Sequence, residues 1–258
     1  MLELFGEDRI CAKDLCIGRE EEVSLRSALE GKMGRLWVDN RQRPSCTLSI
    51  AGDFCYLLGS YIPKEVNALS GLISQLCPGK IIDAGKQWKP LLQNLEKRYP
   101  DSFKSFSRYA LDGNLEWFDR QKLKEYAAAV EPDFHVVRID EDIYRLTMKN
   151  AWTLDYCSNF SSLQDFIDHG IGYVILDKGE IISGASSYAY CDGRIEITIE
   201  TREDYRKRGL AMACAARLIL ECLERNIYPR WDAANIASVT LAEKLGYRFS
   251  REYGVYSI

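Results

Sequence analysis

Hydrophobic and polar positions along the chain follow two different periods, which predict strands and helices in turn. In the first half, the short apolar runs Arg35–Asn40, Cys46–Ile50 and Phe54–Gly59 predict strands. Pro63–Leu76 has apolar residues at helical spacing, and Gln87–Arg98 is a second predicted helix. This half is therefore predicted to be a mixed α/β structure, and it contains no catalytic pattern.

The second half alternates more clearly between the two periods. Helices are predicted over Asp142–Phe160, Leu163–His169, Gly209–Asn226 and Asn235–Leu245, and strands over Phe134–Ile139, Tyr173–Leu176, Ile181–Tyr190, Arg194–Thr201 and Tyr228–Trp231, with one or two closing strands in Tyr247–Ile258. A helical stretch rich in Lys, Glu and Ala, Leu115–Val130, ends just before Pro132. We therefore expect an N-terminal α/β domain of residues 1–130 and a C-terminal domain of residues 131–258.

Composition narrows the classes of function. The 258 residues are 47% hydrophobic and 28% charged, which is typical of a globular protein. The net charge of −4 disfavours a nucleic-acid partner, because binding to phosphate backbones requires a basic excess. No apolar run reaches the roughly 18 residues of a membrane helix. The N-terminus lacks a secretory pattern, and the nine cysteines are scattered without a CxxC pair, so we expect a cytoplasmic protein with reduced thiols, no metal site and no membrane partner.

The stretch Thr201–Ala211 carries the clearest chemical signal. A predicted strand ends there, a basic loop follows, and a helix begins at Gly209. The first turn of a helix has unpaired backbone N–H groups and about half a positive charge, so it favours anions. Arg206, Lys207 and Arg208 add three cations, and Gly209 lets a ligand approach the backbone closely. The segment suits a pyrophosphate, although a solvated basic loop would give the same pattern.

Neighbouring residues favour the pyrophosphate interpretation. The segment Arg206-x-x-Gly209-x-Ala211 resembles the coenzyme A signature Q/R-x-x-G-x-G/A of the GCN5-related N-acetyltransferase (GNAT) superfamily. Pro229–Asn235 and Ser238–Tyr247 resemble the next motif of that superfamily, a strand followed by a helix. The similarity covers about Gly170–Ile258. Within the superfamily, the segment most resembles a bacterial branch that includes antibiotic self-resistance acetyltransferases.

The resemblance implies a fold, an activity and a binding site. The fold would be α/β of the α+β type, with a mixed, mainly antiparallel sheet flanked by helices. The strands Leu36–Asn40 and Ser45–Gly59, followed by a helix, permit the N-terminal half to be a degenerate copy of this fold without proving it. The activity would be transfer of an acetyl group from acetyl-CoA, as co-substrate, to a small-molecule or peptide amine. Acetyl-CoA would contact Ile199, Thr201, Arg206, Lys207, Arg208, Gly209, Leu210, Ala211, Asn235 and Ser238. Asn235 also suits a helix N-cap and Ser238 a first-turn hydroxyl, and these alternatives stay open.

Candidates for the general base come from the strand Arg194–Thr201. Glu196 and Glu200 share one face of this predicted central strand, where an unpaired buried charge would be costly. Either that face opens onto a cleft, where partial burial would raise a carboxyl pKa toward neutrality, or the acids pair with arginines. Asp232, just after its own strand, is a third candidate.

The general acid and the acceptor are less defined. Many superfamily members have a tyrosine where this chain has Ala242, and Tyr247, Tyr253 or Tyr256 would have to replace it. The excess of acids favours a cationic amine as acceptor. Two other functions fit the same residues, namely a non-catalytic acyl-CoA-binding or regulatory module and an interaction protein with a decayed site.

Overall fold

The polypeptide of the computed structural model, residues 1–258, divides into two units. Unit 1 comprises Met1–Arg108 and Glu252–Ile258, and unit 2 comprises Tyr109–Arg251. The division therefore lies at residues 108/109 rather than at residue 130, and the last residues return to the first unit. Helix α4 (Arg120–Ala128) explains the difference: it packs along α7 (Leu210–Glu224), and Arg120 donates a hydrogen bond to the carbonyl of Leu223 at 3.0 Å.

Unit 1 is built on β-strands that follow one another across a sheet. Its elements are β1 (Leu2–Leu4), α1 (Val23–Leu29), β2 (Arg35–Val38), β3 (Cys46–Ala51), β4 (Phe54–Gly59), α2 (Val66–Leu76), β5 (Ile81–Ala84) and α3 (Lys89–Arg98), with a 3-10 segment over Gly6–Cys16. Strands β1 to β4 pair antiparallel, whereas β4 and β5 are parallel and joined through α2. The α/β structure expected for this half is present, and its sheet is mixed.

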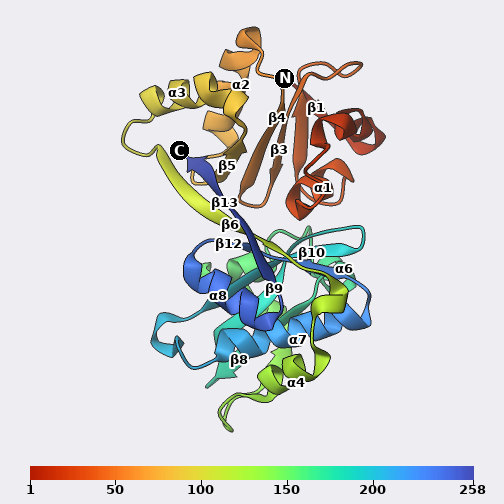
Figure 1. Ribbon diagram of the computed structural model, residues 1–258, viewed down its shortest axis with the longest axis vertical. Coiled ribbons are helices and arrows are strands. Elements are labelled where there is room, and N and C mark those ends of the chain that lie inside the picture. The colour runs from red at the N-terminus through yellow and green to blue at the C-terminus, as the bar shows by residue number, and fades with distance from the viewer. The chain divides into compact units, whose positions relative to one another are not determined.

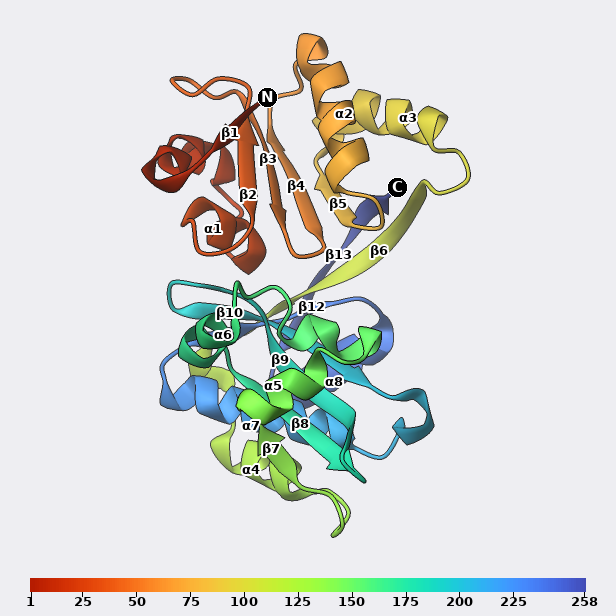
Figure 2. The ribbon, with the colours of Figure 1, turned by 180° about the vertical axis from the view of Figure 1, so that it is seen from behind.

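Both faces of the unit 1 sheet are covered. Leu48, Leu57 and Ile73 belong to a buried cluster between the sheet and the helices α2 and α3. Leu36 and Val38 alternate with Trp37 along β2 and face the opposite side, toward the N-terminal segment. Figures 1 and 2 show α2 and α3 on one side of these strands and α1 on the other.

Unit 2 repeats this order of strands. It contains α4 (Arg120–Ala128), β7 (Val136–Arg138), α5 (Glu141–Thr147), α6 (Leu163–His169), β8 (Gly172–Asp177), β9 (Glu180–Cys191), β10 (Arg194–Thr201), α7 (Leu210–Glu224), β11 (Tyr228–Arg230), β12 (Asp232–Ala233) and α8 (Ile236–Leu245). Strands β7 to β10 pair antiparallel, and β10 and β11 are parallel and joined through α7. Helix α7 packs on one face of β8–β10 and α5 lies on the other (Figures 1 and 2). The same topology in both units agrees with the expected copy of one fold.

Two long strands connect the units. Strand β6 (Lys104–Asp112) begins in unit 1 and pairs with β12 in unit 2, where Ala110 lies opposite Asp232. Strand β13 (Arg248–Ser257) begins in unit 2 and pairs with β5 in unit 1, where Tyr256 lies opposite Ile82. The closing strand of each half of the chain thus pairs with a strand of the other half.

Several predicted elements are shorter in the structure. The expected helix Asp142–Phe160 ends at Thr147 and is followed by a 3-10 segment over Ala151–Tyr156. The expected helix Leu115–Val130 consists of a 3-10 turn and then α4, because Asp119 accepts hydrogen bonds from the N–H groups of Gln121 and Lys122 and so caps α4. None of the helices has the length and apolar character that crossing a bilayer requires.

Candidate functional site

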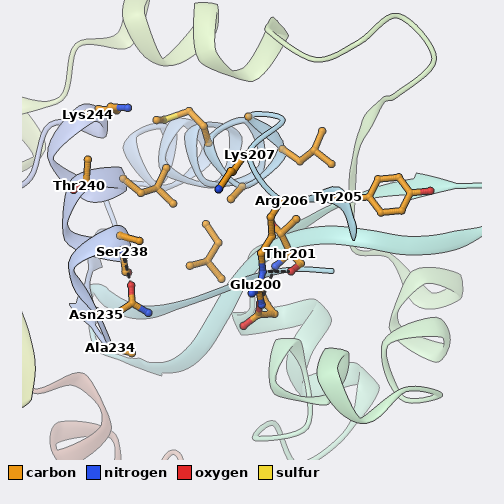
Figure 3. A pocket seen from close by; sticks show the side chains of 17 residues that line it. Glu200, Thr201, Tyr205, Arg206, Lys207, Ala234, Asn235, Ser238, Thr240 and Lys244 are labelled. Atoms are coloured by element: carbon orange, nitrogen blue, oxygen red, sulfur yellow. Dashed lines mark hydrogen bonds and ion pairs between the residues drawn. The ribbon is translucent and has the colours of Figure 1, made fainter. Parts of the chain in front are cut away.

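A cavity of about 710 Å³ lies in unit 2 between the amino end of α7, the end of β10 and helix α8 (Figure 3). This volume is in the range of about 300–1,000 Å³ that is typical of small-molecule sites. The residues that line it come from Ile199 to Met212 on one side and from Ala234 to Lys244 on the other. The segment for which the sequence predicted an anion site therefore lines this cavity.

The start of α7 exposes backbone N–H groups to this cavity. Gly209 occupies the N-cap position in a left-handed conformation, with φ of +78°, and no side chain caps the first turn. Leu210, Ala211 and Met212 form that turn, and all three line the cavity. Because the N–H groups of a first helical turn have no partner within the helix, they favour an anion at this position.

The basic loop before α7 has four cations, of which three are held by carboxylates. Arg202 pairs with Asp204 at 2.8 Å and Arg208 with Glu131 at 2.6 Å, and Arg206 is discussed below. The hydrogen bond from Arg208 lowers the pKa of the Glu131 carboxyl.

Only Lys207 remains available among these loop cations. It lines the cavity, has a φ of +64° and makes no ion pair with any carboxylate. Of the three cations predicted to bind a pyrophosphate, Lys207 is thus the one whose side chain is free to do so. Arg208 does not line the cavity, and its guanidinium is engaged with Glu131 and lies over the Phe134 ring, 4.9 Å from the centroid.

Strand β10 presents an unpaired edge to the cavity. Its parallel pairing with β11 ends where Glu196 lies opposite Arg230, and the chain then turns into β12, which pairs with β6 instead. The pairing of β10 with β9 shifts register at the same point, between Glu196 and Ile197, and continues to Thr201. The edge of β10 beyond Glu196 therefore has backbone groups with no strand partner, which suits an extended ligand arm.

Glu200 is the acid that faces the cavity. Its side chain is 47% exposed, and its carboxylate accepts hydrogen bonds from the Arg206 guanidinium at 3.2 Å and from the Thr201 N–H at 3.2 Å (Figure 3). The Thr201 hydroxyl is 2.8 Å from that of Ser183 on β9. Arg206 also donates to the Thr201 carbonyl at 3.2 Å, so it closes the loop onto the end of β10.

The other two predicted acids lie elsewhere. Glu196 is buried and forms an ion pair with Arg230 at 2.9 Å. Asp232 is also buried, in β12 opposite Ala110. Neither lines the cavity. Of the two alternatives left open for the acids of β10, pairing with arginines holds for both Glu196 and Glu200, and opening onto a cavity holds for Glu200.

Helix α8 forms the opposite wall, and its first turn is fixed by side chains. The Asn235 side chain accepts a hydrogen bond from the Ser238 N–H at 2.9 Å, so Asn235 is an N-cap. The Ser238 hydroxyl accepts one from the buried Trp231 indole at 3.0 Å. Both residues also line the cavity. The structural roles considered for them are confirmed, and their contact with a ligand stays a prediction.

Replacing Asn235 by Ala should lower the free energy of unfolding by about 0.5–2 kcal/mol, because the first turn of α8 loses its cap. Urea denaturation of the variant and the native protein measures this. Asn235→Asp is the matched control, since an aspartate accepts the same hydrogen bond and should retain the stability. Equal stability of the native protein and Asn235→Ala would show that the cap contributes nothing.

No cysteine lines the cavity, and neither does any of the tyrosines considered from the sequence as the acid. Tyr205 does line it, and its hydroxyl donates a hydrogen bond to Asp177. Tyr247 is buried and donates to the Pro229 carbonyl at 2.5 Å, and burial raises its pKa. Ala242, at the usual tyrosine position, is buried as well, and Tyr253 and Tyr256 belong to unit 1. Burial raises the pKa of Cys214 in α7 to about 12, so this thiol stays protonated.

The sequence identified most of the cavity. Nine of the predicted ligand-binding residues line it, and Arg208 does not: the nine are Ile199, Thr201, Arg206, Lys207, Gly209, Leu210, Ala211, Asn235 and Ser238. The residues missed are Tyr205, Met212, Ala234, Ala237, Thr240, Leu241 and Lys244. Four of the missed residues, Ala237, Thr240, Leu241 and Lys244, lie on α8, and the helical spacing of three and four residues from Ala237 leads to the other three.

The family comparison covers nearly the whole chain. A family model described as GNAT acetyltransferase matches residues 14–256. YdfB of Bacillus subtilis (strain 168), an uncharacterized N-acetyltransferase, is 36% identical over 122 residues, which are 46% of this chain and 46% of that protein. The matched region thus spans less than half the length of that relative.

Solved structures show the same similarity. The crystal structure of a GCN5-related N-acetyltransferase-like protein from Streptococcus suis 89/1591 is 36% identical, with a TM-score of 0.86 over 97% of this chain and 98% of that one. A tandem GNAT protein from the clavulanic acid biosynthesis pathway is 12% identical, with a TM-score of 0.55 over 100% of this chain and 97% of the other. The second likeness concerns the fold alone, a GNAT-like mixed α/β fold with two sheets flanked by helices.

Proposed function

Because the chain belongs to the GNAT acetyltransferase family, whose members are acetyl-CoA-dependent N-acetyltransferases, we propose that it transfers an acetyl group from acetyl-CoA to an amine. One observation carries this proposal: the unpaired edge of β10 and the uncapped first turn of α7 line one cavity, together with Lys207. An extended pantetheine arm needs such an edge, and a pyrophosphate needs such N–H groups.

The residues of the cavity fit acetyl-CoA as co-substrate in a defined order. The N–H groups of Leu210 and Ala211 and the ammonium of Lys207 would bind the pyrophosphate. The backbone from Ile199 to Thr201 would pair with the pantetheine arm, with Asn235 and Ser238 facing it from α8 (Figure 3). Extended backbone and helix N–H groups thus replace the water that the donor loses on binding.

The reaction we propose is direct attack by the acceptor in a ternary complex. The neutral amine attacks the thioester carbonyl, a C–N bond forms, and the C–S bond breaks with departure of the coenzyme A thiolate. The proton of the amine passes to the Glu200 carboxylate. No cysteine lines the cavity, and the Cys214 thiol is buried, which supports direct attack over a cysteine-bound acetyl group.

We assign the general base to Glu200 among the three acids considered. Glu200 lines the cavity, whereas Glu196 is paired with Arg230 and Asp232 lies in β12. A carboxylate that is half exposed can receive a proton and return it to solvent, as a general base must. Loss of the leaving thiolate needs no dedicated acid in this scheme, which agrees with Ala242 at the usual tyrosine position.

The acceptor we propose is a small cationic amine, of the kind found in aminoglycosides, polyamine-like compounds and peptide antibiotics. The chain has 38 acidic and 34 basic residues, and the base is itself a carboxylate, so an ammonium group would be attracted.

A panel of amines tests the proposal, with release of the coenzyme A thiol as the measured signal. Cationic amines should give thiol release that depends on both acetyl-CoA and acceptor. Reaction with anionic or neutral acceptors alone would contradict the proposed acceptor class. If none of the amines in the panel gives thiol release and the protein still binds CoA tightly, the alternative of a non-catalytic acyl-CoA-binding module is favoured. The alanine at position 242 also permits that alternative.

Lys207 and Arg208 are equivalent in the sequence pattern, but the structure predicts different effects when each is replaced. Lys207→Met should raise the KM for acetyl-CoA about 10- to 150-fold, because a charge-assisted phosphate contact contributes about 1.5–3 kcal/mol. Arg208→Met removes an adjacent positive charge that is engaged with Glu131 outside the cavity, so its KM should change far less. Steady-state kinetics measures both variants, and equal KM values for the two would contradict the assignment.

A further inference from the structure

The end of the cavity remote from Glu200 carries a cation that the proposed reaction does not use. Lys244, in the last turn of α8, lines the cavity and makes no ion pair with any carboxylate. Figure 3 shows Lys244 and Thr240 at one end of the α8 wall and Ala234 at the other, with Lys207 on the facing wall. Residues 237, 241 and 244 follow helical spacing, so Lys244 continues the lining face of α8.

The cavity lining has more cationic side chains than a pyrophosphate needs. Its lining has three cations, Arg206, Lys207 and Lys244, and one carboxylate, Glu200, which is paired with Arg206. Two lysines therefore remain without a carboxylate partner. The pyrophosphate already has the N–H groups of the α7 first turn and the Lys207 ammonium, so Lys244 is available for a further anionic group.

The position of Lys244 in the cavity indicates which anionic group of the donor it contacts. If acetyl-CoA lies with its thioester near Glu200 and its pyrophosphate at the start of α7, the nucleoside end extends past Met212 and Leu241 toward Lys244. These two side chains offer apolar surface beside an adenine ring, and the ribose 3′-phosphate is the remaining anion of the donor.

We propose that Lys244 binds the ribose 3′-phosphate of coenzyme A and so determines specificity for the free 3′-phosphorylated donor. This inference rests on the proposed function, since it takes the orientation of acetyl-CoA from it. Donors that lack this phosphate, such as 3′-dephospho-coenzyme A or a phosphopantetheine arm carried on a protein, would lose the contact.

Isothermal titration with coenzyme A and 3′-dephospho-coenzyme A tests the inference without an acceptor. The native protein should bind coenzyme A about tenfold more tightly, as expected for one charge-assisted contact. Lys244→Met should bind both ligands with the Kd that the native protein has for the dephospho form, and Lys244→Arg should keep the preference. Lys124→Met, in α4 and outside the cavity, is a matched exposed helical lysine and should leave the preference unchanged.

The outcomes separate this inference from the function on which it rests. Equal binding of the two ligands by the native protein would overturn the role of Lys244 and leave the proposed function standing. Equal preference in the native protein and in Lys244→Met would do the same. Failure of the native protein to bind either ligand would overturn the proposed function itself. A cation in the last turn of a helix stabilises that helix, so replacing Lys244 by Met can lower the stability of the protein. Thermal unfolding of Lys244→Met without ligand is therefore the control that the variant is folded.

Discussion

Replacing Glu200 by Gln is expected to lower kcat by about 10²–10⁴-fold, because the amide cannot accept the proton of the attacking amine. Affinity for coenzyme A should not change, since the amide oxygen still accepts a hydrogen bond from Arg206 and the residues assigned to the pyrophosphate are untouched. The loss therefore falls on the transition state rather than on donor binding. Single-turnover acetylation and calorimetric titration with coenzyme A measure the two quantities separately.

The matched control for Glu200 is Glu203→Gln. Glu203 is an exposed acid of the same loop region but does not line the cavity, so its replacement should leave kcat unchanged. If Glu200→Gln retains full turnover while Glu196→Gln or Asp232→Asn loses it, the base lies at one of those acids and the present assignment is wrong. If all three variants retain full turnover, none of these carboxylates acts as the base.

Replacing Arg230 by Met is expected to lower the free energy of unfolding by about 3–5 kcal/mol, because it removes the guanidinium that pairs with a buried carboxylate. The ion pair between Arg230 and Glu196 measures 2.9 Å, and both side chains are at most 7% exposed. It lies at the last residue pair between β10 and β11, where the two strands separate, and the part of β10 that lines the cavity starts further along at Ile199. The pair thus fixes the point at which the edge of β10 becomes available.

A double-mutant cycle distinguishes this structural role from a catalytic one. Combining Glu196→Met with Arg230→Met should restore part of the stability that either change alone removes, because both charges of this buried ion pair are then removed together. Additive losses in the double variant would show that the two side chains do not act as a pair. Unchanged stability of Arg230→Met would contradict the structural role directly.

The segment that lines the cavity at the start of α7 could be predicted from the sequence because its determinants are local. A strand, a basic loop and a helix beginning at Gly209 are consecutive in the chain, so their relation depends on few long-range contacts. The N-cap role of Asn235 was legible for the same reason, since it depends on the next three residues. The helical spacing of α8 continued to Lys244, although the sequence analysis stopped at Ser238.

Features that depend on distant segments were not predictable in the same way. Arg208 has the same sequence context as Lys207, and only the proximity of Glu131, 77 residues earlier, removes it from the cavity. Glu196 forms a buried ion pair because of Arg230, 34 residues later, and because of the register of two parallel strands. The exchange of β6 and β13 between the halves likewise arises from pairing across the chain, which periodicity within one segment does not record.

Backbone amide shifts in a ¹⁵N-labelled sample titrated with coenzyme A test the central claim most directly. If the start of α7 holds the diphosphate, the largest changes should occur at the N–H groups of Lys207 to Met212, and 3′-dephospho-coenzyme A should reproduce them. Binding of coenzyme A that leaves these amides unchanged, or saturating ligand that produces no change anywhere, would contradict it.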